Sequence, residues 1–170
     1  MACSSAALKG LVKDCSTSIG GVKRVFIADR TSDIKITTES DLVTAISGGT
    51  FYQYYIRQNS SSFSSNATID NTNGVLFVET KLNLVFTRID NAKRLEMNAL
   101  LLADVYVIVE DCNGVVHFLG YENPVTTTAS SAESGQNRTD GNRYTLELTD
   151  VSSGFPMQVK DGVIASLTVA

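Results

Sequence analysis

The chain has no tryptophan, a single histidine and only two prolines in 170 residues. The lone imidazole, His117, has no second metal ligand or nucleophile beside it in the sequence, whereas zinc needs about four ligands and a nucleophile needs an adjacent base. The three cysteines are an odd number and form no Cys-x-x-Cys pair. Cys3 and Cys15 are either bonded to each other or reduced, and we prefer reduced thiols throughout, Cys112 included.

Charge and long apolar runs are also scarce. Charged residues make up 19% of the chain, the net charge is −4, and basic residues adjoin only in pairs such as Lys23-Arg24 and Lys93-Arg94. Tight nucleic-acid binding therefore lacks its electrostatic signature. No apolar run approaches the roughly 18 residues of a membrane span, and Met1–Ser5 lacks the basic start of a secretory signal, so we expect synthesis in the cytoplasm and no membrane partner.

The acidic residues do not form a recognisable catalytic or metal-binding set. Glu110-Asp111, Glu133 and Asp140 are candidates only because they carry carboxylates. Asp70–Gly74 resembles the start of a calcium loop, but Lys81 stands where that loop needs its bidentate glutamate, which favours a simple turn. We therefore expect no catalytic, cofactor-binding or metal-binding residue, no cofactor, and no enzymatic activity.

Alternating hydrophobic and polar residues predict a mainly β protein. One folded domain over residues 1–170 suits the length and the 43% hydrophobic content. Asp41–Ile46 fits either a helical turn or an edge segment. The other short segments with strand character are Val22–Ala28, Ile34–Thr37, Phe51–Arg57, Tyr144–Leu148, Gln158-Val159 and Ile164–Val169.

The most distinctive pattern is a hairpin that pairs Ser62–Asp70 with Val75–Arg88. Asn and Gly in the intervening turn tolerate positive φ. Fourteen residues in a strand would span about 46 Å, against a usual strand of about five or six residues. Such a strand either bends across a barrel corner or projects beyond the domain, where its edges need cover from another chain.

A helix is predicted over Asn91–Leu102, after an N-cap at Asp90. Its apolar positions recur at helical spacing and are expected to face the sheet or plug a barrel end. They are Ala92, Leu95, Ala99 and Leu102.

A second hairpin is expected to join Val105–Glu110 to Val115–Tyr121 through a two-residue turn at Asn113-Gly114, which would place His117 opposite Glu110. The fold class is thus a twisted β-sandwich or barrel with one flanking helix and long hairpins. Residues 1–20 are expected to form an N-terminal arm, and residues 124–142 a long polar loop.

Two segments are candidate subunit contacts. In the aromatic strand, Tyr52, Tyr54 and Ile56 point one way and Phe51 and Tyr55 the other, so either both faces are intramolecular or one meets a neighbour. The polar loop would order against a second copy. The candidate interface residues are Phe51, Tyr52, Tyr54, Tyr55, Thr126, Thr127, Thr128 and Arg138. Alternatively, the tyrosines of a monomeric module bind carbohydrate, although the absence of tryptophan counts against this.

Several stretches together resemble small structural proteins of phages that infect Bacteroidetes, including crAss-like phages. They are Cys15, Ser18–Ala28 (SIGGVKRVFIA), Leu84–Arg88 (LVFTR), Val109–Asp111, Leu119–Tyr121 and Tyr144–Leu146. The resemblance implies a tail-tube-like or tail-hub-like virion protein, made in the bacterial cytoplasm. It would self-assemble into a six- or twelvefold ring beside other virion proteins and form a conduit for DNA ejection. A connector ring near the portal is the alternative within this group. The mildly acidic chain suits transient, non-specific passage of DNA.

Overall fold

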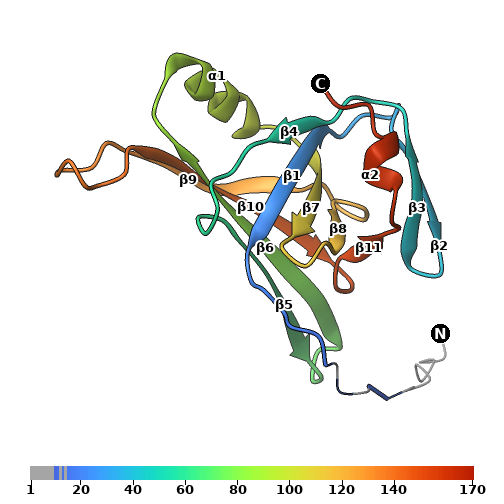
Figure 1. Ribbon diagram of the computed structural model, residues 1–170. Helices are drawn as coiled ribbons and strands as arrows, with labels where there is room; N and C mark the ends of the chain where they lie inside the picture. The colour runs from blue at the N-terminus through green and yellow to red at the C-terminus, as the bar shows by residue number, and fades with distance from the viewer. Residues whose placement is uncertain (1–9, 12, 14) are drawn as a thin grey trace.

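A computed structural model describes residues 10, 11, 13 and 15–170, which form eleven strands and two helices in two sheets (Figure 1). One sheet has the order β2-β3-β11-β8-β7-β1-β4, with strands Lys35–Glu39, Leu42–Ser47, Met157–Val159, Val116–Leu119, Val105–Asp111, Val22–Asp29 and Tyr52–Tyr54. The other has the order β5-β6-β10-β9, with strands Ser62–Asp70, Val75–Thr87, Arg143–Ser152 and Thr126–Glu133. The helices are α1 (Asn91–Leu100) and α2 (Val163–Ser166).

The mainly β sandwich expected from the sequence is confirmed, and the barrel alternative is wrong because neither sheet closes on itself within the described residues. Strand β1 shows why the seven-stranded sheet is apolar on both faces. Val25 and Ile27 point into the core between the two sheets, where Leu84 and Leu146 meet them. Phe26, on the opposite face, packs in a second core that β3, β11 and α2 close. Residues in a strand alternate between faces, so a near-continuous apolar run marks a strand covered on both sides.

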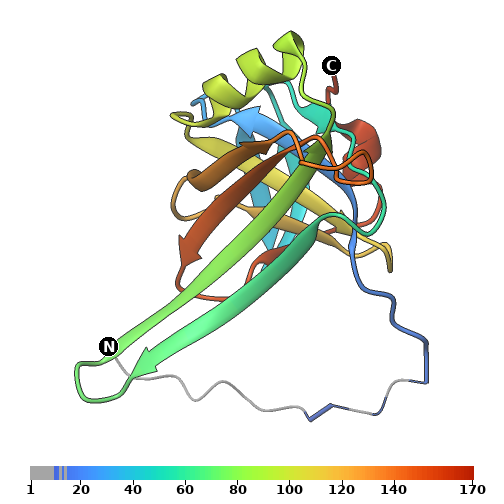
Figure 2. The same ribbon diagram turned by 90° about the vertical axis from the view of Figure 1, so that its left-hand side faces the viewer.

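The long hairpin is present as predicted, with β5 pairing β6 from Ser62↔Asn83 to Asp70↔Val75. Its turn is held by the Asp70 carboxylate, which accepts from the backbone N–H of Thr72 at 2.9 Å and of Asn73 at 3.3 Å. Strand β6 has 13 residues, equivalent to about 43 Å. Strand β10 pairs with β6 only from Val78 onward, so the first residues of β6 extend past β10 together with β5, and the hairpin projects and does not bend around a barrel corner (Figure 2).

Helix α1 begins where predicted, since the Asp90 side chain accepts from the Lys93 N–H at 2.8 Å, but it ends two residues early, at Leu100. The predicted apolar face is wrong. Met97 and Leu100 are the buried residues, whereas Leu95 is 56% and Leu102 95% exposed. The helix stands at one end of the sandwich (Figure 1) and contacts it mainly through its C-terminal half, so the regular apolar stripe faces away.

The β7–β8 register differs from the prediction by one residue, because the turn is longer than two residues. Asp111 and Val115 are joined by a backbone hydrogen bond, and Gly114 adopts a φ of +83°. His117 therefore lies opposite Val109, not Glu110, and its ring stacks on Phe63 at 5.0 Å between centroids. Burial lowers the pKa of His117.

Glu110 is buried and binds two basic residues of the neighbouring strand β1. Its carboxylate accepts from Lys23 Nζ at 2.9 Å and from the Arg24 guanidinium. The expected surface pair with His117 is thus replaced by a structural ion pair across the β1–β7 ladder. This leaves Glu110 and His117 without the shared geometry that acid–base chemistry would need.

Three further expectations change. Residues 124–142 are not one long loop, because β9 pairs with β10, Val125 bridges Val105, and the longest irregular stretch is residues 134–142. Ile164–Val169 is not a strand: α2 occupies its start, and Val169 forms a single bridge with Phe51. Asp41–Ile46 is neither helical nor an edge, since β3 lies between β2 and β11. Much of the predicted arm, including Cys3, lies outside the described residues.

Candidate assembly surfaces

The four-stranded sheet ends in β5 on one side and β9 on the other, and within the described residues neither strand has a second neighbour. Both edges are rich in Ser, Thr, Asn and Ala, with Phe63 and Ile69 of β5 as the large apolar residues and the only charges at the strand ends, Asp70 and Glu133. Monomeric proteins commonly protect such edges with inward-pointing charges, lysine or proline. These two strands have none of those features. The outward-facing backbone groups of β5 (nine residues) and β9 (eight residues) are therefore open to pairing with another chain.

The face of this sheet that points away from the core is mostly polar and nearly neutral, with Phe77 and Val85 of β6 as apolar exceptions. Its central positions are half-exposed, which shows that no described element covers them. Lys81 lies 3.6 Å from Glu147 and 3.9 Å from Glu79, so its positive charge is partly offset by two carboxylates. Opposite charges spaced in this way leave little net field over the centre of the face.

An apolar pair lies at the tip of the projecting hairpin. Ile69 and Leu76 are directly opposite each other across β5 and β6, and both are more than half exposed. Val75, next to the turn, is also exposed. The tip lies at the end of the molecule farthest from α1 (Figure 2). The sequence left open whether this strand projects or bends across a barrel corner, because the alternating pattern does not show where the covering sheet stops.

The predicted aromatic cluster is divided by the structure. Phe51 is only 1% exposed and belongs to the second core, so its assignment as an interface residue is corrected. Tyr52 and Tyr54 share a side, as expected, and line a 310 Å³ cavity against α1. The Tyr54 hydroxyl donates to Glu96, and burial together with this carboxylate raises the pKa of Tyr54. Tyr55, 82% exposed, is the aromatic residue of this segment most available to a partner.

The threonines assigned to the polar loop lie on the β9 edge. Thr126 and Thr128 are exposed, and the Thr128 hydroxyl lies 3.0 Å from the Glu147 carboxylate. The Thr127 hydroxyl donates to the Leu100 carbonyl at 2.7 Å, which ties β9 to the end of α1. Arg138 is exposed in the β9–β10 turn, beyond the edge. Three of these four side chains thus remain available to a neighbour, and Thr127 is partly structural.

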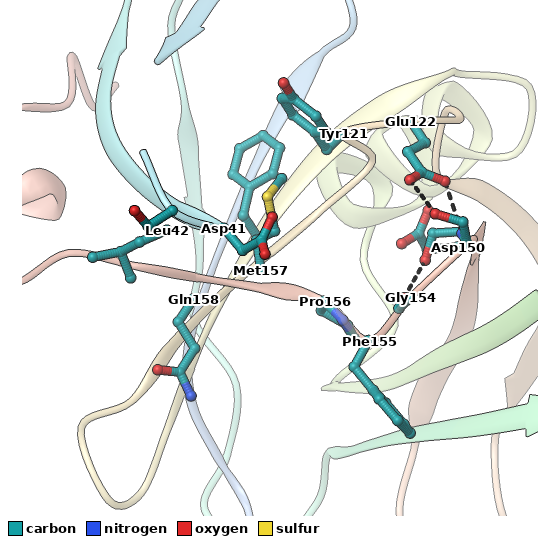
Figure 3. A pocket seen from close by; sticks show the side chains of 14 residues that line it. Asp41, Leu42, Tyr121, Glu122, Asp150, Gly154, Phe155, Pro156, Met157 and Gln158 are labelled. Atoms are coloured by element: carbon teal, nitrogen blue, oxygen red, sulfur yellow. Dashed lines mark hydrogen bonds between the residues drawn. The ribbon is translucent and has the colours of Figure 1, made fainter. Parts of the chain in front are cut away.

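A separate pocket of 760 Å³, which the sequence did not indicate, lies among the β2–β3 turn, the β10–β11 turn and the segment after β8 (Figure 3). Tyr121 and Phe155 on its rim are both more than 40% exposed. Asp150 lines it, is 3% exposed, and lies close to Glu122. Glu122 in turn accepts from the Ser153 backbone N–H at 2.7 Å and from its hydroxyl.

Asp150 is unusual among the described carboxylates because its Oδ1 is buried with no hydrogen-bond partner in the part of the chain that the structure covers. Burial raises the pKa of Asp150 to about 6, and the negative charge of Glu122 contributes in the same direction. The Gly120 backbone N–H and the Arg30 guanidinium oppose the rise without cancelling it. At neutral pH the pocket therefore holds a poorly solvated negative charge.

Asp150→Asn is expected to stabilise the protein at pH 7.5 by about 2 kcal/mol and to change little at pH 4. The folded state retains a proton on Asp150 between its ordinary pKa of 3.8 and its folded pKa of about 6, so the wild-type protein loses stability as pH rises through this window. Urea unfolding of both proteins at the two pH values measures the difference. The exposed Asp161→Asn change is the control, and an equal effect of the two substitutions would contradict the assignment.

No set of three or more His, Cys, Asp or Glu side chains in the described part of the chain is arranged to hold a metal ion. None of its helices is long and apolar enough to cross a bilayer. No protein-family model matches the chain, and no curated protein is similar to it.

Proposed function

We propose that this protein is a non-enzymatic structural component of a phage virion that self-assembles into a ring or tube of the tail, as a tail-tube or tail-hub subunit, and forms a conduit for DNA ejection. The observation that carries the proposal is the pair of unprotected, uncharged edge strands on opposite sides of one four-stranded sheet. The sequence resemblance to phage structural proteins supplies the biological setting.

The two edges differ from each other, which determines the kind of assembly they favour. Each copy has two different free edges, β5 and β9. When β5 of one copy pairs with β9 of the next, the contact is head-to-tail, because it joins two different surfaces of the protein. Such a contact closes into a ring if the rotation between copies divides a full turn, and otherwise gives an open filament. A sixfold or twelvefold ring is the order implied by the resemblance.

The uncovered sheet face suits the lining of a DNA channel. It carries Lys81 between two carboxylates, together with uncharged positions such as Thr145 and Asn83. A strongly basic lining would retain the phosphate backbone, whereas a nearly neutral polar lining lets it slide. Partners in this proposal are further copies of the chain and neighbouring virion proteins, with DNA in transient contact only. A connector ring near the portal uses the same edges and remains the alternative position in the particle.

Light scattering behind a sizing column, with electron micrographs of the same peak, tests the proposal. A ring of six copies or more would exceed 100 kDa (six times 18.3 kDa is about 110 kDa), and micrographs are expected to show closed rings or tubes. The measurement is made over a series of concentrations, because edge pairing is concentration-dependent. An 18.3 kDa monomer across that series, including millimolar protein, would overturn self-assembly.

A further inference from the structure

The pocket beside Asp150 has the chemistry of a cation-binding site. Asp150 contributes a carboxylate oxygen that is buried and without a hydrogen bond in the described structure, and Glu122 and Asp41 line the same pocket. A buried carboxylate oxygen without a partner is costly, and an ammonium or guanidinium group placed against it would recover much of that cost. The pocket therefore favours a ligand that brings one positive charge.

The nearest cation on the described chain is already held elsewhere. Arg30 Nε lies 3.4 Å from the Tyr106 hydroxyl, and its Nη2 donates to the Glu122 backbone carbonyl at 3.2 Å. Its guanidinium lies over the Tyr106 ring at 5.5 Å. These contacts hold Arg30 against Tyr106 and the Glu122 carbonyl, and Asp150 Oδ1 keeps no hydrogen bond to any described residue.

The pocket rim adds apolar and aromatic surface. Tyr121 and Phe155 are both exposed, and Pro156 and Met157 line the same pocket. Aromatic rings next to a carboxylate bind the methylene chain and the ammonium group of a lysine together. The rim therefore favours a lysine within a short apolar segment over a small inorganic cation.

The N-terminal segment of the chain carries this combination. Its sequence around the two lysines is Leu8-Lys9-Gly10-Leu11-Val12-Lys13, and these are the only basic residues before Lys23. Leu11 and Lys13, which the structure describes, are exposed, Leu11 completely so. The chain just before β1 runs away from the sandwich (Figure 2) after the Gly21 carbonyl accepts from the Cys112 N–H. About ten residues of extended chain reach roughly 35 Å, enough to meet an adjacent subunit.

We propose that the Asp150 pocket binds the Lys9–Lys13 segment of a second copy, with a lysine ammonium against Asp150 and the neighbouring apolar residues against Tyr121 and Phe155. The inference deepens the proposed function and rests on it for the presence of the second copy. In the assembly, this contact would link subunits independently of the β5 and β9 edges. Binding of the segment to its own chain is the competing arrangement, which the test distinguishes.

The first test is a fluorescence-anisotropy titration. The probe is a dye-labelled synthetic peptide of residues 6–16 with Cys15→Ser, and the receptor is the full chain with Lys9→Gln and Lys13→Gln, so that its own segment does not compete. We expect saturable binding, weakened at least tenfold by Asp150→Asn in the receptor or by Gln at both lysines of the peptide. Asp161→Asn is the matched control, and thermal unfolding checks that each receptor is folded. Equal affinity for the Asp150→Asn receptor, or for the Gln peptide, would overturn the proposal.

The second test identifies the source of the segment. A mixture of ¹⁴N- and ¹⁵N-labelled protein with the native sequence is treated with a carbodiimide, which joins lysines to nearby carboxylates. Crosslinks between Lys9 or Lys13 and Asp41, Glu122 or Asp150 that contain both isotopes are expected, and crosslinks of one isotope only would overturn the second-copy assignment. Rings that persist without peptide binding would remove this inference and leave the proposed function. Peptide binding by a protein that stays monomeric would contradict the proposed self-assembly and leave the peptide-binding pocket.

Discussion

A proline at one of two neighbouring positions of β9, Ser130 or Ser131, is expected to raise the concentration needed for ring formation about a hundredfold, or about 2.8 kcal/mol per contact. Successive N–H groups of an antiparallel edge strand point alternately toward β10 and away from it, and Ser130 and Ser131 pair regularly with Leu146 and Thr145. One of the two prolines therefore removes a donor used only by a neighbouring subunit. The other removes a donor to β10 and lowers the stability of the sandwich.

Light scattering over a concentration series measures assembly of these variants, and thermal unfolding measures their stability. Ser131→Thr is the matched control, because it keeps the backbone donor and has high β propensity. The edge-pairing model requires one proline variant that is folded like the wild type but defective in assembly. Rings with unchanged concentration dependence in both proline variants would exclude β9 from the contact.

Replacement of Tyr54 and of Tyr55 by alanine is expected to separate folding from association. Tyr54 packs on Phe86 with 5.9 Å between ring centroids and donates to Glu96, so Tyr54→Ala should reduce the free energy of unfolding by about 2–3 kcal/mol. Tyr55 is 82% exposed, and its truncation should change the free energy of unfolding by less than about 0.5 kcal/mol. Any effect of Tyr55→Ala should appear in assembly.

Urea unfolding at a concentration below assembly, followed by light scattering above it, measures the two effects. Tyr54→Phe keeps the ring and removes only the hydroxyl, so it isolates the contact with Glu96. An equal loss of stability in Tyr54→Ala and Tyr55→Ala would show that both side chains contribute to the core, against the observed exposure of Tyr55. No change in assembly for Tyr55→Ala would remove it from the candidate interface.

Local signals in the sequence were sufficient for the elements whose structure is locally determined. The β5–β6 turn is defined by the Asp70 carboxylate, which accepts a backbone hydrogen bond from Thr72, and by the positive φ of Gly74. Both features lie within the same five-residue segment of the sequence. Asp90 likewise defines the start of α1. The β7–β8 register was wrong because Asn113-Gly114 is compatible with turns of two or three residues, and only the Asp111–Val115 hydrogen bond distinguishes them.

The wrong apolar face of α1, the wrong interface assignment of Phe51 and the failure to predict the Asp150 pocket share a different cause. A helical stripe such as Leu95 and Leu102 predicts burial only if a sheet lies beneath it, and here the sandwich ends before it reaches that stripe. Phe51 is buried in the second core, whose members extend from Phe26 to Val163, with Val169 beside it. The pocket joins three separate turns, so no single sequence window contains it. Each case depends on long-range packing, which periodicity does not report.

The order in which the strands pair has a consequence for synthesis of the chain. Strand β1 cannot pair until β7 has been synthesised, and β6 cannot pair with β10 until β10 has been synthesised. Strands β5 and β6, in contrast, can pair as soon as residue 87 has left the ribosome. Folding dominated by such distant pairs is slow, so a nascent chain would display the β5–β6 hairpin with its partner strand still unsynthesised. The Ser, Asn and Thr residues of β5 then make this early intermediate soluble, and we expect apolar substitutions along that strand to reduce the yield of protein before they affect the finished particle.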